Sequence, residues 1–221
     1  MNEKIETNGT ALQLKSRKTL TGSNMVKIAL LSAISFILTL PLFRWNVPIF
    51  PGFLSMDFSD LPAMIALVSM GAVPALWVAA LKNILDVVIT GTTSAGIGPF
   101  ANFLVAATYL LPMGYVISRL KGTKGIIFGA IVGTLVTTIM ASLFNYTVLI
   151  HAYAFVFGVE IQHFIDIANA INSNVINFET FIFFSIAPFN LFKFGLTSIA
   201  FIILYKAIGQ QMGIVPKINK L

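Results

Sequence analysis

The sequence contains no cysteine, only two histidines and few charged residues, since Asp, Glu, Lys and Arg together make up 10% of its 221 positions. Without cysteine the chain forms no disulfide and offers no thiolate as a nucleophile or metal ligand. A soluble domain carries about 25% charged residues, so this shortage argues against a soluble fold. Hydrophobic residues make up 57% of the chain, with phenylalanine at 20 positions. These proportions are typical of an integral membrane protein.

Sequence motifs for catalysis and for energy coupling are also missing. There is no G-x-x-x-x-G-K-[ST] loop, so we expect no ATP hydrolysis by that route, and neither H-E-x-x-H nor G-x-S-x-G occurs. His151 and His163 stand apart without an acidic motif, which makes a metal site improbable on spacing. An enzyme needs acids, bases or a metal within mutual reach. We therefore predict neither an enzyme nor a resident cofactor or metal.

Six apolar segments, separated by glycine, proline and polar clusters, are interpreted as membrane-spanning helices. The predicted fold is an all-α membrane protein with a cytoplasmic tail at residues 1–24, a transmembrane domain at 25–206 and a second cytoplasmic tail at 207–221. The expected spans are 25–43, 59 to a break at 71–74, that break to about 90, 99–120, 125–157 and 180–206. The fifth is long for a bilayer, so we expect its end to project or bend.

The distribution of basic residues predicts the orientation of these spans. An even number of spans with both termini in the cytoplasm places eleven of the fourteen Lys and Arg inside. Arg44 is then outside, and Lys82 and Lys193 fall within spans. The net charge of +6 is therefore interpreted as the positive-inside bias rather than as a nucleic-acid surface. The eleven are Lys4, Lys15, Arg17, Lys18, Lys27, Arg119, Lys121, Lys124, Lys206, Lys217 and Lys220.

Four polar residues inside apolar spans are the strongest functional signal. Asn102, Asn145, Asn190 and Lys193 all fall between the middle and the outer surface of the predicted bundle. Intramembrane polar groups mark functional sites, and amides offer both a donor and an acceptor to a neutral ligand. Hydrogen bonds between packed helices are the alternative for each Asn. Because Asn190 and Lys193 are three residues apart, they share one helical face.

Two further patterns leave alternatives open. Lys82 precedes Asp86 by four residues, so a structural ion pair along one helix is the favoured interpretation there. The connector 158–179 has apolar residues at helical spacing, which predicts a short helix that lies on the membrane or the bundle, or that forms a lid over the pocket.

Small residues recur at one-turn spacing on two predicted spans. Ala29 and Ala33 lie on the first span, and Gly125, Gly129 and Gly133 lie on the fifth. Such residues let helix backbones approach closely. Each set is compatible with packing inside the bundle or with docking of a partner membrane protein.

Taken together, these features resemble the substrate-binding S components of energy-coupling factor (ECF) vitamin transporters, and within them the riboflavin-binding member. The resemblance covers about residues 25–206. It rests on the long first outer loop, on Ala29-x-x-x-Ala33, and on three stretches with specific residues. These are Phe53-Leu54-Ser55-Met56-Asp57-Phe58-Ser59-Asp60-Leu61-Pro62, Leu81-Lys82-Asn83 and Pro188-Phe189-Asn190-Leu191-Phe192-Lys193.

The resemblance implies a function, partners and a set of site residues. It implies a subunit in the bacterial cell membrane that binds riboflavin from outside and topples in the bilayer to deliver it inward. The resemblance also implies that this subunit docks through Ala29 and Ala33 onto a membrane coupling subunit, which is driven by two cytosolic ATPases. The implied ligand-binding residues are Asn145, Asn190, Lys193, Asn102, Phe53, Leu54, Met56 and Asp57.

A self-sufficient secondary transporter or channel for another small metabolite is the alternative function. It would share the intramembrane polar residues but would also need acids deep in the membrane for coupling. Asp86 is the deepest acid on the predicted topology.

Overall fold

The computed structural model describes residues 22–120 and 122–208. The predicted terminal tails at 1–24 and 207–221 lie outside these ranges, except that residues 22–24 and 207–208 are helical. Within the described part, helices dominate and one two-stranded ladder is present. In chain order the elements are α2 (Gly22–Thr39), η2 (Pro41–Phe43), β1 (Trp45–Asn46), β2 (Ser55–Met56), α3 (Leu61–Met70), α4 (Ala72–Leu85), η3 (Asp86–Thr90), α5 (Ile97–Arg119), α6 (Gly122–Phe144), η4 (Asn145–Leu149), α7 (Ile150–Phe157), α8 (Ile161–Asn169), α9 (Phe178–Phe181), η5 (Ile182–Ile186) and α10 (Ala187–Ile208).

Five helical segments of the described chain are long and apolar enough to cross a membrane. They are Gly22–Thr39, Ala72–Thr90, Ile97–Arg119, Gly122–Phe157 and Phe178–Ala207. The predicted second span is instead α3, which has only ten residues. It has Pro62 in its first turn, as predicted, and it ends at Gly71, whose φ of 103° favours glycine. The described part of the chain thus has five helical segments of spanning length and one shorter apolar helix, α3, as expected of a multi-pass membrane protein.

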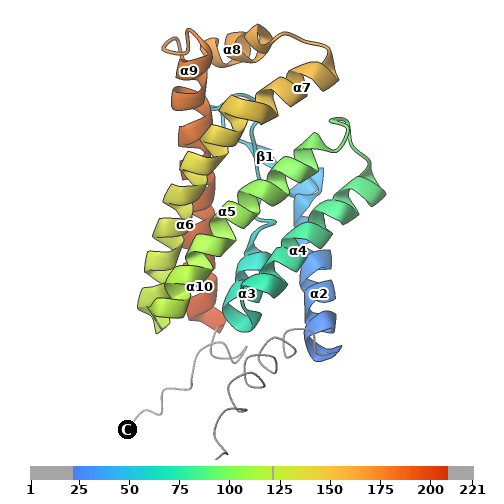
Figure 1. The fold of residues 1–221 in the computed structure, drawn as a ribbon, viewed down its shortest axis with the longest axis vertical. Coiled ribbons are helices and arrows are strands. Elements are labelled where there is room, and N and C mark those ends of the chain that lie inside the picture. The colour runs from blue at the N-terminus through green and yellow to red at the C-terminus, as the bar shows by residue number, and fades with distance from the viewer. Residues whose placement is uncertain (1–21, 121, 209–221) are drawn as a thin grey trace, which may run out of the picture.

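The helices stand side by side in one bundle (Figure 1). α5 and α10 both pack against α6, while α4 contacts α2, α3 and α5. The long helical run Gly122–Phe157 contains the wider π-type turn η4, and Figure 1 shows α7 leaning away from α6 beyond that turn. The predicted bend in the fifth span is therefore present.

The first predicted loop folds into a small hairpin rather than an irregular segment. β1 pairs antiparallel with β2, with Trp45 opposite Met56 and Asn46 opposite Ser55. Turns with hydrogen bonds from Phe50 N to Val47 O and from Leu54 N to Pro51 O shape the residues between the strands. We call residues 44–60 the outer hairpin.

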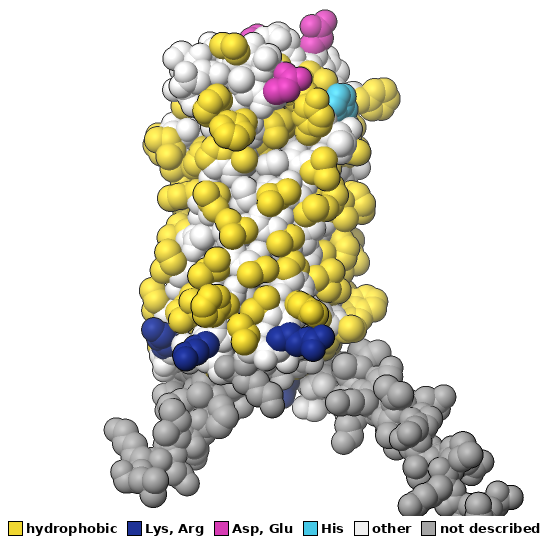
Figure 2. All heavy atoms as spheres, turned by 60° about the vertical axis from the view of Figure 1, so that its left-hand side comes forward, with side chains coloured by type: hydrophobic (Ala, Val, Ile, Leu, Met, Phe, Trp, Pro, Cys, Tyr) yellow, Lys and Arg dark blue, Asp and Glu magenta, His cyan; other side chains and the backbone are white. Residues whose placement is uncertain are grey.

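Charged side chains gather at the two ends of the bundle. Figure 2 shows Lys and Arg in a band at one end, Asp, Glu and His at the other, and apolar side chains over the surface between them. Lys27, Arg119, Lys124 and Lys206 are exposed near helix ends. This separation follows the predicted bias of basic residues.

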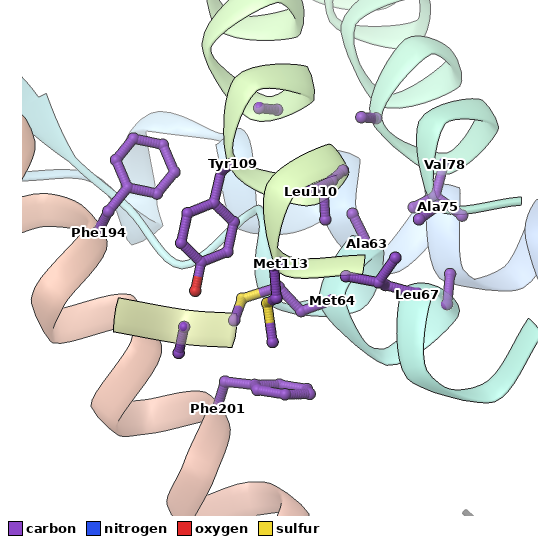
Figure 3. Packing of buried hydrophobic residues seen from close by; sticks show 14 of the residues in the cluster. Ala63, Met64, Leu67, Ala75, Val78, Tyr109, Leu110, Met113, Phe194 and Phe201 are labelled. Carbon is purple, nitrogen blue, oxygen red and sulfur yellow. The ribbon is translucent and has the colours of Figure 1, made fainter. Parts of the chain in front are cut away.

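A buried apolar cluster fills the half of the bundle nearer the basic end. It joins α3, α4, α5, α6 and α10, and Figure 3 shows Tyr109, Met113, Met64 and Phe201 within it. The rings of Tyr109 and Phe194 stack with centroids 4.9 Å apart. The Tyr109 hydroxyl shares a 2.7 Å hydrogen bond with Ser198 Oγ, so its polar tip is satisfied. This cluster closes the lower half of the bundle.

The two small-residue stripes have different surroundings. Ala29 and Ala33 are exposed, because α2 buries its other face through Ile28, Ser32, Ser35 and Thr39. Packing inside the bundle is therefore the wrong interpretation for this pair. The glycines pack internally against α5: a Cβ on Gly129 would lie 3.0 Å from the Met113 carbonyl oxygen, and one on Gly133 would lie 3.1 Å from the Tyr109 ring.

Replacing Gly133 with leucine is expected to lower the free energy of unfolding by about 1–3 kcal/mol, because the new side chain must force α6 away from α5. The matched control is Ala33→Leu, which adds the same kind of bulk on an exposed face. Thermal unfolding of both purified variants in detergent measures the effect. Equal midpoints for the two variants would contradict the assignment of the glycines to internal packing.

Candidate functional site

A cavity of about 350 Å³ lies in the half of the bundle nearer the acidic end. The outer hairpin, α5, the run from η4 to α7, α8, η5 and α10 all contribute to its lining. Its apolar lining residues are Phe53, Leu54, Ala101, Val105, Leu149, Ile150, Tyr153, Phe157, Phe164, Ile186 and Phe189. A mostly apolar pocket with a few placed polar groups is the usual design of a small-molecule site.

Asn145 and Asn190 face the cavity with a defined orientation. The Nδ2 atom of each donates a 2.8 Å hydrogen bond to a carbonyl oxygen one turn earlier, at Ala141 and Ile186 respectively. A carbonyl oxygen only accepts, so the amide NH₂ has to be on that side. Each amide therefore keeps its Oδ1 free of that contact and able to accept a hydrogen bond from a ligand.

Lys193 supplies a cationic donor next to these amides. It lines the same cavity as Asn190, which agrees with their predicted shared face. Its Nζ lies 3.9 Å from Asp57 Oδ2, and its side chain is only 13% exposed. That separation makes an ion pair but not a hydrogen bond, so the ammonium hydrogens remain available to a ligand.

Asp57 itself lies behind Lys193 and is held in its charged form. Burial alone would raise the pKa of this carboxyl, but Lys193, Lys82 and hydrogen bonds from the Ser59 hydroxyl and backbone N–H outweigh it. They lower its pKa from 3.8 to about 2. Asp57 thus remains a carboxylate that forms an ion pair with Lys193.

Lys82 does not pair with Asp86, so that interpretation of the sequence was wrong. Its Nζ donates to Asp60 Oδ1 at 2.6 Å and to Ser59 Oγ at 3.0 Å. Asp60 is at the N-cap position of α3, but its carboxylate makes no capping hydrogen bond and pairs with Lys82 instead. The Ser59 carbonyl in turn accepts a hydrogen bond from Ser35 Oγ on α2. We call Asp57, Ser59, Asp60 and Lys82 the buried charge network.

The residues predicted for the outer hairpin separate into two groups. Phe53 and Leu54 line the cavity. Met56 is fully buried against Phe50 and Phe189, and neither Met56 nor Asp57 is among the lining residues. Met56 and Asp57 are therefore buried next to residues that line the cavity and do not line it themselves. Asn102 lines the cavity from α5, near the end where it was expected.

Several lining residues were not predicted as site residues. Phe164 comes from α8 in the connector, where its ring lies 5.5 Å from that of Phe53, so α8 covers one side of the cavity. The amphipathic spacing of the connector was the available signal. Tyr153 carried no such signal, because an aromatic residue in an apolar helix is the ordinary case. Phe189 belongs to one of the stretches that carry the family resemblance, but it was not predicted to line the site.

Two of the helices that form the cavity have a π-type turn at its level. η4 contributes Asn145 and Leu149 to the lining, and η5 contributes Ile186. Such turns are rare and occur often at functional sites.

A smaller hollow of about 240 Å³ adjoins the cavity, and we call it the side chamber. The two share Arg44, Thr93, Ser94, Gly98 and Asn102 among their lining residues. In the side chamber an Arg44 Nη2 atom lies 3.7 Å from Asp86 Oδ2. Asp86, at the start of η3, therefore pairs with Arg44 of the hairpin and not with Lys82.

Comparison with known proteins identifies relatives along most of the chain. A family model described as "ECF transporter, substrate-specific component" matches residues 23–205. The chain is 36% identical over 186 residues to the riboflavin transporter RibU of Staphylococcus aureus (strain TCH60), covering 84% of this chain and 90% of that protein. It is 29% identical over 182 residues to the riboflavin transporter FmnP of Bacillus subtilis (strain 168), covering 82% and 89%.

The fold also matches a solved structure described as "Structure and mechanism of the S component of a bacterial ECF transporter". The TM-score is 0.67 at 32% sequence identity, and the match covers 86% of this chain and 98% of that one. Sequence and fold thus agree on the same family.

Replacing Asp60 with asparagine is expected to lower the free energy of unfolding by about 3–5 kcal/mol, because it leaves the buried Lys82 ammonium without its closest carboxylate. Adding Lys82→Met should recover more than half of the loss by removing the unpaired charge. Chemical or thermal unfolding in detergent measures both. A double variant less stable than Asp60→Asn would contradict the pairing.

Proposed function

Because the chain belongs to the family of substrate-specific components of ECF transporters, we propose that it binds riboflavin in the cavity for import. The observation that carries this proposal is one pocket with a mostly aromatic and aliphatic lining, to which Asn145, Asn190 and Lys193 contribute polar groups. The names of its relatives support the choice of ligand.

The chemistry of a flavin matches this combination of apolar and polar lining residues. Its flat ring system is largely apolar and suits a site lined by Phe53, Phe164 and Phe189. Its pyrimidine edge presents one N–H donor between two carbonyl acceptors. The Oδ1 atom of Asn145 or Asn190 can accept from that N–H, and the Lys193 ammonium can donate to a carbonyl. Asn102 adds a third amide where the cavity meets the side chamber.

In the proposed topology the chain crosses the membrane six times, with α3 as a short second crossing and both termini in the cytoplasm. The basic band shown in Figure 2 then lies on the cytoplasmic side of a bacterial cell membrane, and the cavity lies nearer the outer side. The outer hairpin and α8 lie over it from outside. The ring contact between Phe53 and Phe164 supports α8 as a lid.

Transport in this proposal depends on partners. A membrane coupling subunit and two cytosolic ATPases supply the energy, since the sequence has no phosphate-binding loop of its own. Ala29 and Ala33 are the proposed docking face. Their exposure on α2 supports it, because small residues on an open helix face allow another helix to approach closely.

Replacing Lys193 or Asn190 with alanine is expected to weaken riboflavin binding at least tenfold, since each removes a buried hydrogen-bonding partner. Quenching of flavin fluorescence by the purified protein measures the affinity. Lys206→Ala, at the exposed end of the same helix, is the control and should bind like the parent. Parent-like binding by both site variants would overturn the site, and binding of a different vitamin alone would overturn the ligand.

Replacing Ala29 and Ala33 with leucine is expected to abolish riboflavin uptake by cells that hold the coupling proteins, while flavin binding by the purified variant stays intact. The added bulk blocks helix approach but lies outside the cavity. Val148→Leu enlarges an exposed residue of another span and serves as the control. Normal uptake by the double variant, or loss of uptake in the control as well, would contradict this docking face.

A further inference from the structure

The side chamber adds a carboxylate, Asp86, to polar groups that it shares with the main cavity. It places a cation, Arg44, opposite an anion, Asp86, among the hydroxyl groups of Thr90, Thr92, Thr93 and Ser94. Asn102 lies where the two hollows meet, while Asn145, Asn190 and Lys193 line the main cavity alone, so polar groups continue along one connected hollow.

The Arg44–Asp86 ion pair is long, and it leaves hydrogen-bonding capacity of Arg44 unsatisfied. Its closest atoms are 3.7 Å apart, too far for a hydrogen bond, while the side chains are 34% and 12% exposed. Asp86 Oδ1 accepts a 2.8 Å hydrogen bond from Thr90 Oγ1. The Nε atom of Arg44 is buried without a hydrogen-bond partner among the described residues. A buried donor of this kind is costly to leave unpaired.

A ligand group that enters the side chamber therefore meets a donor and a carboxylate together. A hydroxyl group satisfies both, since it accepts from the guanidinium and donates to the carboxylate. A phosphate monoester carries about −1.5 to −2 charges near neutral pH and accepts much more than it donates. It would gain Arg44 but would lie beside the carboxylate of Asp86, and like charges in contact are strongly unfavourable.

We propose that the side chamber binds the neutral, hydroxylated chain of the flavin and that Asp86 makes the site discriminate against the phosphorylated form, flavin mononucleotide. This inference rests on the proposed riboflavin function and adds a specificity-determining residue to it. Arg44 is the donor in this subsite, and Asp86 is both an acceptor and the element that repels an anion.

The experiment compares riboflavin and flavin mononucleotide by fluorescence titration on the purified full-length protein. The parent is expected to prefer riboflavin. Asp86→Asn should shift the ratio of the two affinities about tenfold or more toward the phosphorylated flavin, because it leaves Arg44 without a competing anion. Arg44→Gln should shift the ratio in the opposite direction. Asp166→Asn removes the same charge from an exposed site on α8 and should leave the ratio unchanged.

A second comparison guards against poor folding of Asp86→Asn. The pair Arg44→Gln and Arg44→Gln/Asp86→Asn contains no unpaired arginine, and the double variant should bind flavin mononucleotide relatively better than the single one. An unchanged affinity ratio in the Asp86 variants, or an equal shift in Asp166→Asn, would overturn the proposed role of Asp86. A parent that binds no riboflavin would overturn the proposed function instead, so the two failures are distinct.

Discussion

The ammonium group of Lys82 is the constraint on which much of this structure depends. Its side chain is 3% exposed inside an apolar bundle, so the ammonium depends on protein groups as partners. Asp60 and Ser59 meet it from the segment that enters α3, and Asp57 adds to the negative charge there. A polar stretch of chain is thereby held deep inside an apolar bundle, where it would otherwise be unfavourable.

That one requirement organises parts of the protein that are far apart in sequence. The Ser59 carbonyl accepts from Ser35, which ties the network to α2, and Asp57 faces Lys193, which ties it to α10. The outer hairpin ends in the same residues, so the position of its cavity-lining tip follows from the network. The cavity and the exposed face of α2 are therefore both connected to one set of buried charges.

Local patterns in the sequence predicted what depends on helical spacing. The three-residue separation of Asn190 and Lys193 placed both on the cavity, and glycine and proline marked the break between α3 and α4. The partner of Lys82 could not be found this way, because the i, i+4 rule pointed to Asp86 while Asp60 lies 22 residues away. The length of α3 was hidden by apolar composition that continues across Gly71. Tyr153 could not be found from the sequence, because only the fold shows that this aromatic residue of an apolar helix lines the cavity.

The shortness of α3 has a consequence for how far a bound molecule has to travel. Ten helical residues rise about 15 Å, roughly half of a hydrocarbon core that is about 30 Å thick. The outer hairpin, whose tip lines the cavity, rests at the start of this helix. In the proposed orientation, a ligand that has merely bound is already near the midplane of the membrane. The remaining path to the cytoplasm is then only about one short helix long.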